Sequence, residues 1–370
     1  MKKVIALFLT LTMVFALVAC GGNTAPAATT AEAPAAEAPA EEAAPATEAA
    51  AVEEDTTSTF TWSLGTIYSD PTTSTTYNAF GESVQKFCDL VGESTNGRVT
   101  VPPYYDSVLG GSGDLYDQVA TDEIQVFIGQ PMSTIDTRYG MTSIPGLFTD
   151  YDMVEKVFCN PESDFYKLMS GVLAEDGLTL ASNNISVFRV FYNNTKEIHQ
   201  PADLSGMTVR IYEDSICKTY WSGLCSATVI PYSELFMSLQ TGVIDGSEMT
   251  QSYGPSTAYQ VCKYCSDLNW QWTWGGATII NSQAMAELPA SLQEAVLKAA
   301  QDAAAFYNTT WRQYDSECQA TMESLGMTYT NLTADERVAW TEYGQSLSDQ
   351  FISIIGADFY NQAMEMINAK

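Results

Sequence analysis

Residues 201–210 read Pro-Ala-Asp-Leu-Ser-Gly-Met-Thr-Val-Arg, and residues 239–248 read Leu-Gln-Thr-Gly-Val-Ile-Asp-Gly-Ser-Glu, in a chain of 370 residues. In the first stretch, Asp203 and Gly206 predict a turn. The alternation from Met207 to Tyr212 predicts a strand that carries Arg210 into the interior. Because a buried guanidinium requires an anion, Arg210 must meet either an internal acid, Glu213 or Asp214, or an anionic ligand.

The second stretch predicts the element beside this strand. Tyr232 to Leu239 has the pattern of a helix, and Gly242 is a typical helix stop. Val243-Ile244 predicts a short strand that runs into a turn at Asp245-Gly246. The two stretches therefore place a guanidinium and a turn at neighbouring strand ends. In this order and spacing the residues closely resemble the solute-binding subunit of TRAP transporters, the tripartite ATP-independent carriers of organic acids.

Further motifs carry the same resemblance over almost the whole chain from Phe60 to Lys370. In chain order they are Thr95-Asn96-Gly97-Arg98-Val99, Val108-Leu109-Gly110-Gly111 followed by a predicted helix to Ala120, Ser143-Ile144-Pro145-Gly146-Leu147-Phe148, and Tyr259-Gln260-Val261-Cys262-Lys263-Tyr264. Each motif alone is weak, because glycine and proline turns recur in many folds. Several of them in register are a much stronger signal.

Strand-like and helix-like segments alternate from Phe60 onward, which predicts an α/β protein with largely parallel sheets. The expected strands lie near residues 60–64, 98–101, 124–128, 179–181, 187–192 and 209–212, and the expected helices at 79–91, 113–120, 153–159 and 165–174. The resemblance implies a two-lobed, periplasmic-binding-protein-like fold with a ligand cleft between the lobes.

The 311 residues from Phe60 exceed one comfortable core, so two lobes are expected. By resemblance, residues 60–183 and about 275–314 form lobe one, and about 184–274 and 315–370 form lobe two. A segment without Gly or Pro runs from after Pro289 to Gly326, with Ser291 as the expected N-cap and Glu294 completing a capping box. A helix of that length spans roughly 50 Å and would brace both lobes.

The N-terminal residues predict export. Met1-Lys2-Lys3 and the apolar run 4–17 form a signal peptide, residues 1–19, that is too short to be a stable membrane span. Leu17-Val18-Ala19-Cys20 has the form of a lipobox, so Cys20 is the expected lipidation site; the alternative is an ordinary signal with a chance cysteine. Residues 20–59 comprise this cysteine and an Ala-, Pro- and Glu-rich linker, too poor in apolar side chains to fold.

Composition limits the partners. From Phe60 onward there are 14 Lys and Arg against 37 Asp and Glu, which disfavours nucleic acid because two polyanions repel each other. Seven cysteines follow Cys20, an odd number for an exported chain. Cys262-Lys-Tyr-Cys265 is half of a zinc or redox motif, but no second pair has the required spacing and His199 is the sole histidine. We therefore expect buried thiols, with no metal and no cofactor.

The resemblance assigns the binding residues. Arg210 matches the family's carboxylate-binding arginine, and two parallel N–H groups of a guanidinium suit a carboxylate. Arg189 stands on an otherwise apolar strand and should find its partner in the cleft or the hinge. Tyr232 matches a wall position of the pocket, and Gln130 and Tyr68 are the candidates from lobe one. Each of these three could instead be ordinary surface or core.

Two departures concern the pocket's chemistry. Glu248 keeps the family's acidic residue after the Asp-Gly turn, but Met249 and Thr250 stand where many relatives have Asn-Pro, which replaces an amide with an adaptable apolar contact. Trp270, Trp272 and Trp274 recur at every second residue and would share one face of a strand. That face either packs between the lobes or supplies Trp272 and Trp274 as a ligand wall for a larger apolar or aromatic acid.

These observations predict a lipid-anchored, extracytoplasmic binding protein that delivers an organic acid to the small and large membrane subunits of a TRAP transporter. A binding protein for an ABC importer or a sensor is the alternative within the same fold. An extracellular hydrolase is the alternative of another class. The chain lacks a Gly-x-Ser-x-Gly elbow, a His-Glu-x-x-His helix and a phosphate-binding glycine loop, so we do not expect an enzyme.

Overall fold

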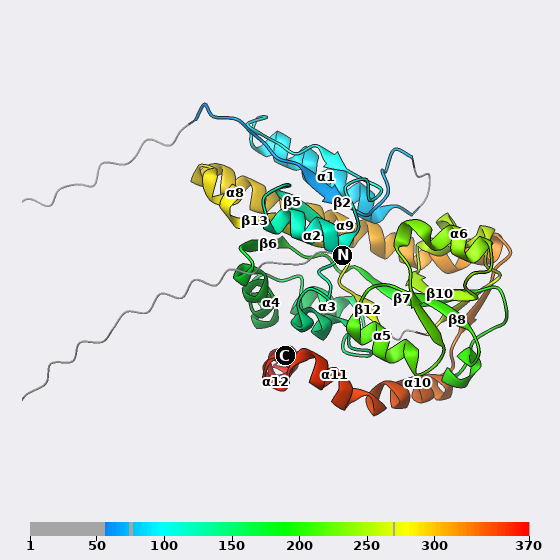
Figure 1. Ribbon diagram of the computed structural model, residues 1–370. Helices are drawn as coiled ribbons and strands as arrows, with labels where there is room; N and C mark the ends of the chain where they lie inside the picture. Colours follow the sequence, from blue (N-terminus) through cyan, green and yellow to red (C-terminus); the bar gives the residue numbers. More distant parts are fainter. Residues whose placement is uncertain (1–55, 74–76, 269–270, 370) are drawn as a thin grey trace, which may run out of the picture. The chain divides into compact units, whose positions relative to one another are not determined.

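The computed structural model describes residues 56–73, 77–268 and 271–369 (Figure 1). Helices and short strands alternate along these residues, which confirms the α/β class. The signal peptide, Cys20 and most of the expected linker lie outside the described residues, as does Trp270.

The strands form two main sheets and one small parallel pair, β1 with β3. The first sheet has the order β4-β2-β5-β13-β6, and the second has the order β14-β11-β7-β10-β8-β9, with β12 pairing to β7. The strands are β1 Phe60–Thr61, β2 Leu64–Thr66, β3 Val99–Thr100, β4 Pro103–Tyr104, β5 Val126–Gly129, β6 Leu178–Ser182, β7 Val187–Asn193, β8 Thr208–Ile211, β9 Ser226–Val229, β10 Gly246–Thr250, β11 Tyr264–Asp267, β12 Trp272–Thr273, β13 Ala277–Asn281 and β14 Thr328–Asn331.

Helices cover these sheets. The α-helices are α1 Ala79–Ser94, α2 Ser112–Ala120, α3 Tyr151–Val157, α4 Asp164–Glu175, α5 Ser215–Ser222, α6 Leu235–Gln240, α7 Tyr253–Ser256, α8 Ser282–Glu287, α9 Ala290–Ser324, α10 Ala334–Ser346, α11 Ser348–Ile355 and α12 Ala357–Asn368. Short 3-10 helices are η1 Thr137–Ser143, η2 Pro201–Leu204, η3 Tyr232–Glu234 and η4 Ala258–Gln260.

The sheets are mixed rather than largely parallel. In the first sheet β13 runs antiparallel to both β5 and β6, and in the second β7 runs antiparallel to β10, β11 and β12. The strands of the first sheet fall within residues 60–183 and 275–314, and those of the second within 184–274 and 315–370. The chain therefore passes from one sheet to the other after β6, returns before β13 and passes over again along α9. The alternation of apolar and polar residues predicts where strands occur but not whether neighbouring strands run parallel or antiparallel. For that reason the prediction of largely parallel sheets was wrong.

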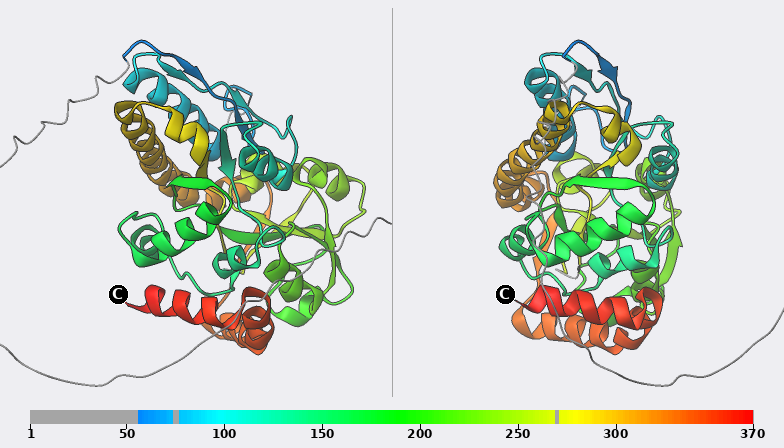
Figure 2. Two further views of the ribbon diagram at one scale, coloured as in Figure 1. Left: turned by 60° about the vertical axis from the view of Figure 1, so that its left-hand side comes forward. Right: turned by 90° about the vertical axis from the view of Figure 1, so that its left-hand side faces the viewer.

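The long helix α9 confirms the predicted brace. It packs against α1 and β6 at its first half, and against α7 and β14 toward its end (Figures 1 and 2). Its buried face is built largely from alanine and from large aromatic side chains such as Tyr307 and Trp311. The expected capping box is wrong, because the helix begins after Pro289, which occupies the N-cap position without a side-chain cap. Proline presets the backbone angle that a helix start requires.

The last three helices pack against elements that belong to both sheets. Helix α11 contacts α5 of the second sheet and η1 of the first, while α12 contacts α4 (Figure 1). A continuous hydrophobic core lies beneath these helices and between the sheets, and a second core cluster lies under α1 and α9. These helices therefore contact elements from both sides of the molecule, and the assignment of residues 315–370 to lobe two stays a prediction.

The segment that opened the sequence argument folds mostly as predicted. Strand β8 buries Arg210, which is 4% exposed, and α6 ends before Gly242, whose φ of +73° favours glycine. The expected strand at Val243-Ile244 is wrong. Val243 is exposed in the turn, and β10 begins only at Gly246, in parallel pairing with Val209 of β8.

Candidate ligand-binding site

A cavity of about 380 Å³ lies between residues that follow strands of the first sheet and residues of the second. Ligand pockets have volumes of this order. Among its lining residues are six of the expected site residues: Tyr68, Gln130, Arg189, Arg210, Tyr232 and Met249. The structure therefore places in one cavity six residues that the sequence had predicted to lie together, although they are far apart along the chain. Their role in binding stays a prediction, since the structure holds no ligand.

Arg210 extends into this cavity from β8, the strand next to the edge strand β9 of the second sheet. Its Nε donates to the carbonyl oxygen of Ile230 at 2.8 Å, and its Nη1 contacts the Met249 sulfur at 3.9 Å. Within the part of the chain that the structure describes, no Asp or Glu forms a salt bridge with Arg210. Burial lowers the pKa of Arg210, an effect that Glu248 opposes and Arg189 reinforces. The guanidinium is thus a buried cation whose terminal nitrogens are available to an anion.

Arg189 differs from Arg210 because an internal carboxylate neutralises it. Its Nε donates to Glu248 Oε2, its Nη1 to Thr273 Oγ1 at 3.2 Å, and its Nη2 to the Glu248 carbonyl at 3.2 Å. Burial alone would lower the pKa of Arg189, but the Glu248 carboxylate and the Tyr212 ring, 4.6 Å from the guanidinium carbon, raise it above its usual value. Arg189 lines the cavity, yet its hydrogen-bonding groups serve the fold.

Neither of the internal acids considered as partners, Glu213 and Asp214, forms a salt bridge with Arg210 among the described residues. Asp214 caps α5 by accepting from the Cys217 amide at 2.8 Å, and it also accepts from the hydroxyls of Ser133 and Ser143 at 2.8 and 3.1 Å. Glu213 is exposed beside the cavity. The structural salt bridge considered for Arg210 is therefore not formed.

Aromatic rings wall the cavity from both sides. Tyr68 stacks on Phe80 with ring centroids 4.2 Å apart, and its hydroxyl donates to the Gly275 carbonyl. Tyr232 meets Tyr253 edge to face at 6.2 Å. The first pair belongs to the side of the first sheet and the second pair to that of the second, so a ligand in the cavity would lie between two aromatic surfaces.

Two small or unpaired groups complete this wall. A Cβ on Gly275 would come within 2.9 Å of the Tyr68 hydroxyl and 3.2 Å of Phe80, so glycine lets these rings approach the chain. The Tyr253 hydroxyl is buried and has no hydrogen-bond partner among the described residues. A buried hydroxyl without a partner is unfavourable, which makes this one a candidate ligand contact.

The cavity continues past Arg210 into a second space of about 450 Å³. Gln130, Arg210 and Tyr232 line both spaces, so together they form one cleft. The side-chain amide of Gln130 has no hydrogen-bond partner within the described residues, and Met249 lies in contact with both arginines. Asp114 and Glu213 line the second space.

The expectation that Trp272 and Trp274 form a ligand wall does not agree with the structure. The two indoles do share one face, as the alternation predicted, but that face is the core. Trp272 donates to the Ile185 carbonyl at 2.5 Å, Trp274 donates to Asn183 Oδ1, and both pack against Phe158. Burying indole rings that find internal acceptors stabilises the core more than exposing them at a wet cleft.

Several lining residues were not predicted from the sequence. Thr273 lies between the two tryptophans and faces the cavity, so the alternation that placed the indoles together could have found it. Phe80 stands one residue inside a predicted helix, where an aromatic residue gives no distinct signal. Tyr253 follows β10 in α7, a helix of four residues that is too short to show a periodic pattern.

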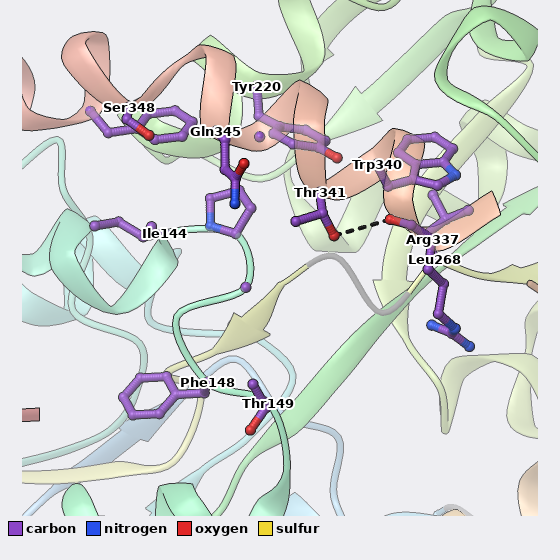
Figure 3. Close-up of a pocket in the computed structure, with 14 residues that line it drawn as sticks. Ile144, Phe148, Thr149, Tyr220, Leu268, Arg337, Trp340, Thr341, Gln345 and Ser348 are labelled. Carbon is purple, nitrogen blue, oxygen red and sulfur yellow. Dashed lines mark hydrogen bonds between the residues drawn. The ribbon is translucent and has the colours of Figure 1, made fainter. Parts of the chain in front are cut away.

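Another cavity, of about 370 Å³, lies where α10 and α11 face residues 144–149 (Figure 3). It shares no lining residue with the cleft. Its arginine, Arg337, has a carboxylate partner, because Nη2 lies 3.2 Å from Asp267 Oδ2. This contrast sets Arg210 apart and supplies a control for experiments.

The cysteines add no second site. Cys88, Cys159, Cys217, Cys225, Cys262, Cys265 and Cys318 are free thiols in this structure. Cys262 and Cys265 are both buried, and burial raises the pKa of the Cys262 thiol to about 12. No group of His, Cys, Asp and Glu suited to a metal ion occurs among the described residues. Within the same residues, no helix has both the length and the apolar character needed to cross a membrane.

An α/β fold with a buried arginine in a cleft between two sheets suits a protein that binds a small anionic solute. Residues 72–354 match the family described as bacterial extracellular solute-binding protein, family 7, or DctP, and the chain belongs to this family. It is 27% identical over 284 residues to a solute-binding protein of Chromohalobacter salexigens, covering 74% of this chain and 80% of that protein. It is 26% identical over 290 residues to the C4-dicarboxylate-binding periplasmic protein DctP of Rhodobacter capsulatus, covering 75% and 84%.

Solved structures give the same fold. A TRAP periplasmic solute-binding protein from Chromohalobacter salexigens with bound D-glucuronate aligns with a TM-score of 0.76 and 24% identity over 84% of this chain and all of that one. One from Sulfurospirillum deleyianum with bound succinate aligns with a TM-score of 0.74 and 21% identity, over 83% and 99%. These findings confirm the recognition as a DctP-type solute-binding protein and the two-lobed fold, and the family consists of binding proteins rather than enzymes.

Proposed function

We propose that this chain captures an organic acid in the cleft through Arg210 and delivers it to the small and large membrane subunits of a TRAP transporter. The observation that carries the proposal is the buried Arg210 guanidinium without an internal carboxylate, beside an Arg189 that has one. The names of relatives support it, since one is a C4-dicarboxylate-binding protein and one structure of the same fold holds D-glucuronate.

The cleft accounts for how an acid would be held. The terminal nitrogens of Arg210 offer paired donors to the two oxygens of a carboxylate. Nε is fixed by the Ile230 carbonyl, so the guanidinium plane is oriented before the ligand arrives, which reduces the entropy lost on binding. Residues 68 and 80 on one side of the cleft and 232 and 253 on the other enclose the part of the ligand beyond its carboxylate. A ligand that contacts both lobes would then stabilise the closed state of the protein, in which the lobes lie against it.

The location of the protein belongs to the same proposal. Residues 1–19 are removed, Cys20 carries the lipid, and the linker to residue 59 tethers the binding domain to the outer face of the membrane. At about 5 to 6 Å times the square root of its length, the 37-residue stretch from Asn23 to Thr59 would hold the domain roughly 30 to 35 Å from the membrane.

Calorimetric titration of Arg210 variants tests the carboxylate contact. A thermal-shift screen over carboxylic acids first supplies the ligand, since an acid at 100 times its Kd stabilises the fold by about 2.7 kcal/mol. Arg210→Ala should then weaken binding of that acid by about 3 to 5 kcal/mol, or roughly two to four decades. Arg210→Lys should recover part of the loss, because an ammonium keeps the charge but loses the paired geometry.

The matched control is Arg337→Ala, which removes an arginine from the cavity of Figure 3 and leaves the cleft intact. It should bind the acid as the unchanged protein does. Affinity of Arg210→Ala within threefold of the unchanged protein would show that the carboxylate is held elsewhere. Melting curves without ligand must also show that Arg210→Ala remains folded.

A further inference from the structure

The charges in the cleft do not suit a dicarboxylate. Arg189, Arg210 and Glu248 are all buried and carry a net charge of one, because Glu248 neutralises Arg189. One ligand carboxylate on Arg210 would bring the net charge of this buried group to zero. A second carboxylate would need another cation, since an ionised group buried without a partner is strongly unfavourable.

No such cation is present among the described lining residues. Neither space of the cleft has a lysine or histidine in its wall, and the two arginines are the only basic side chains there. The described residues 68–73 and 77–80, which supply much of the wall on the first sheet's side, include no basic residue. The second space instead has Asp114 and Glu213 in its wall, so a carboxylate that extended there from Arg210 would meet negative charge.

The remaining wall suits a neutral ring. Tyr68 and Phe80 stack with an angle of 7° between their planes and present a flat surface. Tyr232 and Tyr253 stand on the opposite side, and Met249 lies next to Arg210. Aromatic faces bind other rings by offset stacking or edge-to-face contact, and they also pack against the apolar face of a sugar. Tyrosine, serine and threonine hydroxyls are the main polar groups of the first space.

We propose that the acid accepted by this cleft is a monocarboxylate borne on an uncharged ring, and that dicarboxylates are excluded. The inference rests on the proposed function and narrows it. Aromatic acids and sugar-ring acids share this chemistry. The ligand class proposed here differs from the C4-dicarboxylate in the name of the relative from Rhodobacter capsulatus.

Calorimetry with four probes tests the assignment: benzoate and terephthalate, which share a ring but carry one and two carboxylates, D-glucuronate as the sugar-ring monoacid, and succinate as the open-chain diacid. At pH 7 the tighter of benzoate and D-glucuronate should bind at least a hundredfold more tightly than either diacid. Which of the two is tighter distinguishes an aromatic from a sugar ligand. A diacid that binds as tightly as the better ring monoacid would overturn the proposed exclusion of dicarboxylates. If neither benzoate nor D-glucuronate binds at millimolar concentration, the proposal that the ligand carries a ring is wrong.

A charge variant tests the explanation separately. Gln130→Lys places a second cation where both spaces of the cleft meet, and Gln130→Met is its uncharged control of similar length. The lysine variant should bind terephthalate at least tenfold more tightly than the methionine variant does. Equal affinities would contradict the role of charge.

Arg210→Ala keeps this inference apart from the proposed function. If it abolishes binding while diacids bind best in the unchanged protein, the carboxylate contact stands and only the monocarboxylate class is wrong. If it leaves binding of every probe unchanged, the proposed function fails and the inference falls with it.

Discussion

Glu248 bonds Arg189 and leaves Arg210 without a carboxylate, although its strand β10 lies between the strands of both arginines. Its Oε2 accepts from Arg189 Nε, and its Oε1 accepts from the Tyr212 amide at 3.3 Å. Both oxygens are therefore engaged. The one buried acid between the two buried arginines pairs with Arg189 alone, so Arg189 is bound within the sheet and the terminal nitrogens of Arg210 have no carboxylate partner among the described residues.

Glu248→Gln should destabilise the fold rather than act on the ligand alone. It leaves Arg189 buried and charged without a counter-ion, which we expect to lower the free energy of unfolding by about 3 to 5 kcal/mol. Urea denaturation followed by circular dichroism measures this. The control is Glu175→Gln, which removes an acid from the pair with Arg138; this acid's side chain is 62% exposed, so the loss should be much smaller than in Glu248→Gln. Equal losses in both variants would contradict a structural role for the buried pair.

Tyr253→Phe should separate binding from stability. The hydroxyl has no partner among the described residues, so removing it should leave the free energy of unfolding unchanged or raise it slightly. If the hydroxyl bonds the ligand, affinity for a ligand with a hydrogen-bonding group should fall by about 1 kcal/mol or more, which is about fivefold or more.

The matched variant for stability is Tyr192→Phe. The Tyr192 hydroxyl donates to the carbonyls of Thr250 and Gln251 at 3.1 and 2.9 Å, so its removal should cost about 1 kcal/mol of stability. Thermal melts without ligand compare the two. A larger loss in Tyr253→Phe than in Tyr192→Phe would show that the Tyr253 hydroxyl is satisfied within the protein.

The sequence predicted the elements of the fold better than their pairing. Turn residues such as Gly206 and Gly242 act locally, so the strand that buries Arg210 and the end of α6 were found from the sequence alone. Strand direction depends on partners far along the chain. For that reason the antiparallel course of β7 and β13 could not be inferred from alternation.

The site was predictable to a similar extent. Arg210 and Arg189 are unusual on apolar strands, and this chemistry signals a buried charge at the level of sequence. Which arginine Glu248 would neutralise depends on register, with Thr250 opposite Arg189 and Ser247 beside Arg210. The prediction of Trp272 and Trp274 as a ligand wall failed for a related reason. Alternation shows which side chains share a face, but tertiary packing decides whether that face is core or cleft.

Asp315→Asn should stabilise the protein at neutral pH. Burial raises the pKa of Asp315, which accepts from the Tyr151 hydroxyl at 3.3 Å, to about 6. Because this pKa lies above the unfolded value near 3.9, the folded state binds more protons between about pH 4 and 6, and stability falls as the pH rises through that window. Above it the ionised carboxylate costs on the order of 3 kcal/mol.

The asparagine variant removes this cost and keeps an oxygen for Tyr151. Its advantage in urea denaturation should thus be largest at pH 7 and vanish at pH 4. Asp302→Asn, on the same helix but with a side chain 45% exposed beside Lys298, should show no such gain. An equal gain of Asp315→Asn at both pH values would show that its carboxyl is not titrating in that window.

Cys20→Ser tests the proposed lipid anchor near the N-terminus. Two acyl chains on Cys20 would hold the protein firmly on the membrane, since each buried CH₂ contributes about 0.8 kcal/mol and one chain alone binds only reversibly. The variant should therefore appear in the soluble fraction after cell fractionation, and mass spectrometry should find the lipid only on the unchanged protein. Ligand affinity should not change, because the acid is held by Arg210 and a linker rich in Ala, Pro and Glu separates Cys20 from residue 60. Membrane association that persists in Cys20→Ser would refute the lipid anchor, while loss of ligand binding would show that the N-terminal segment contributes to the cleft.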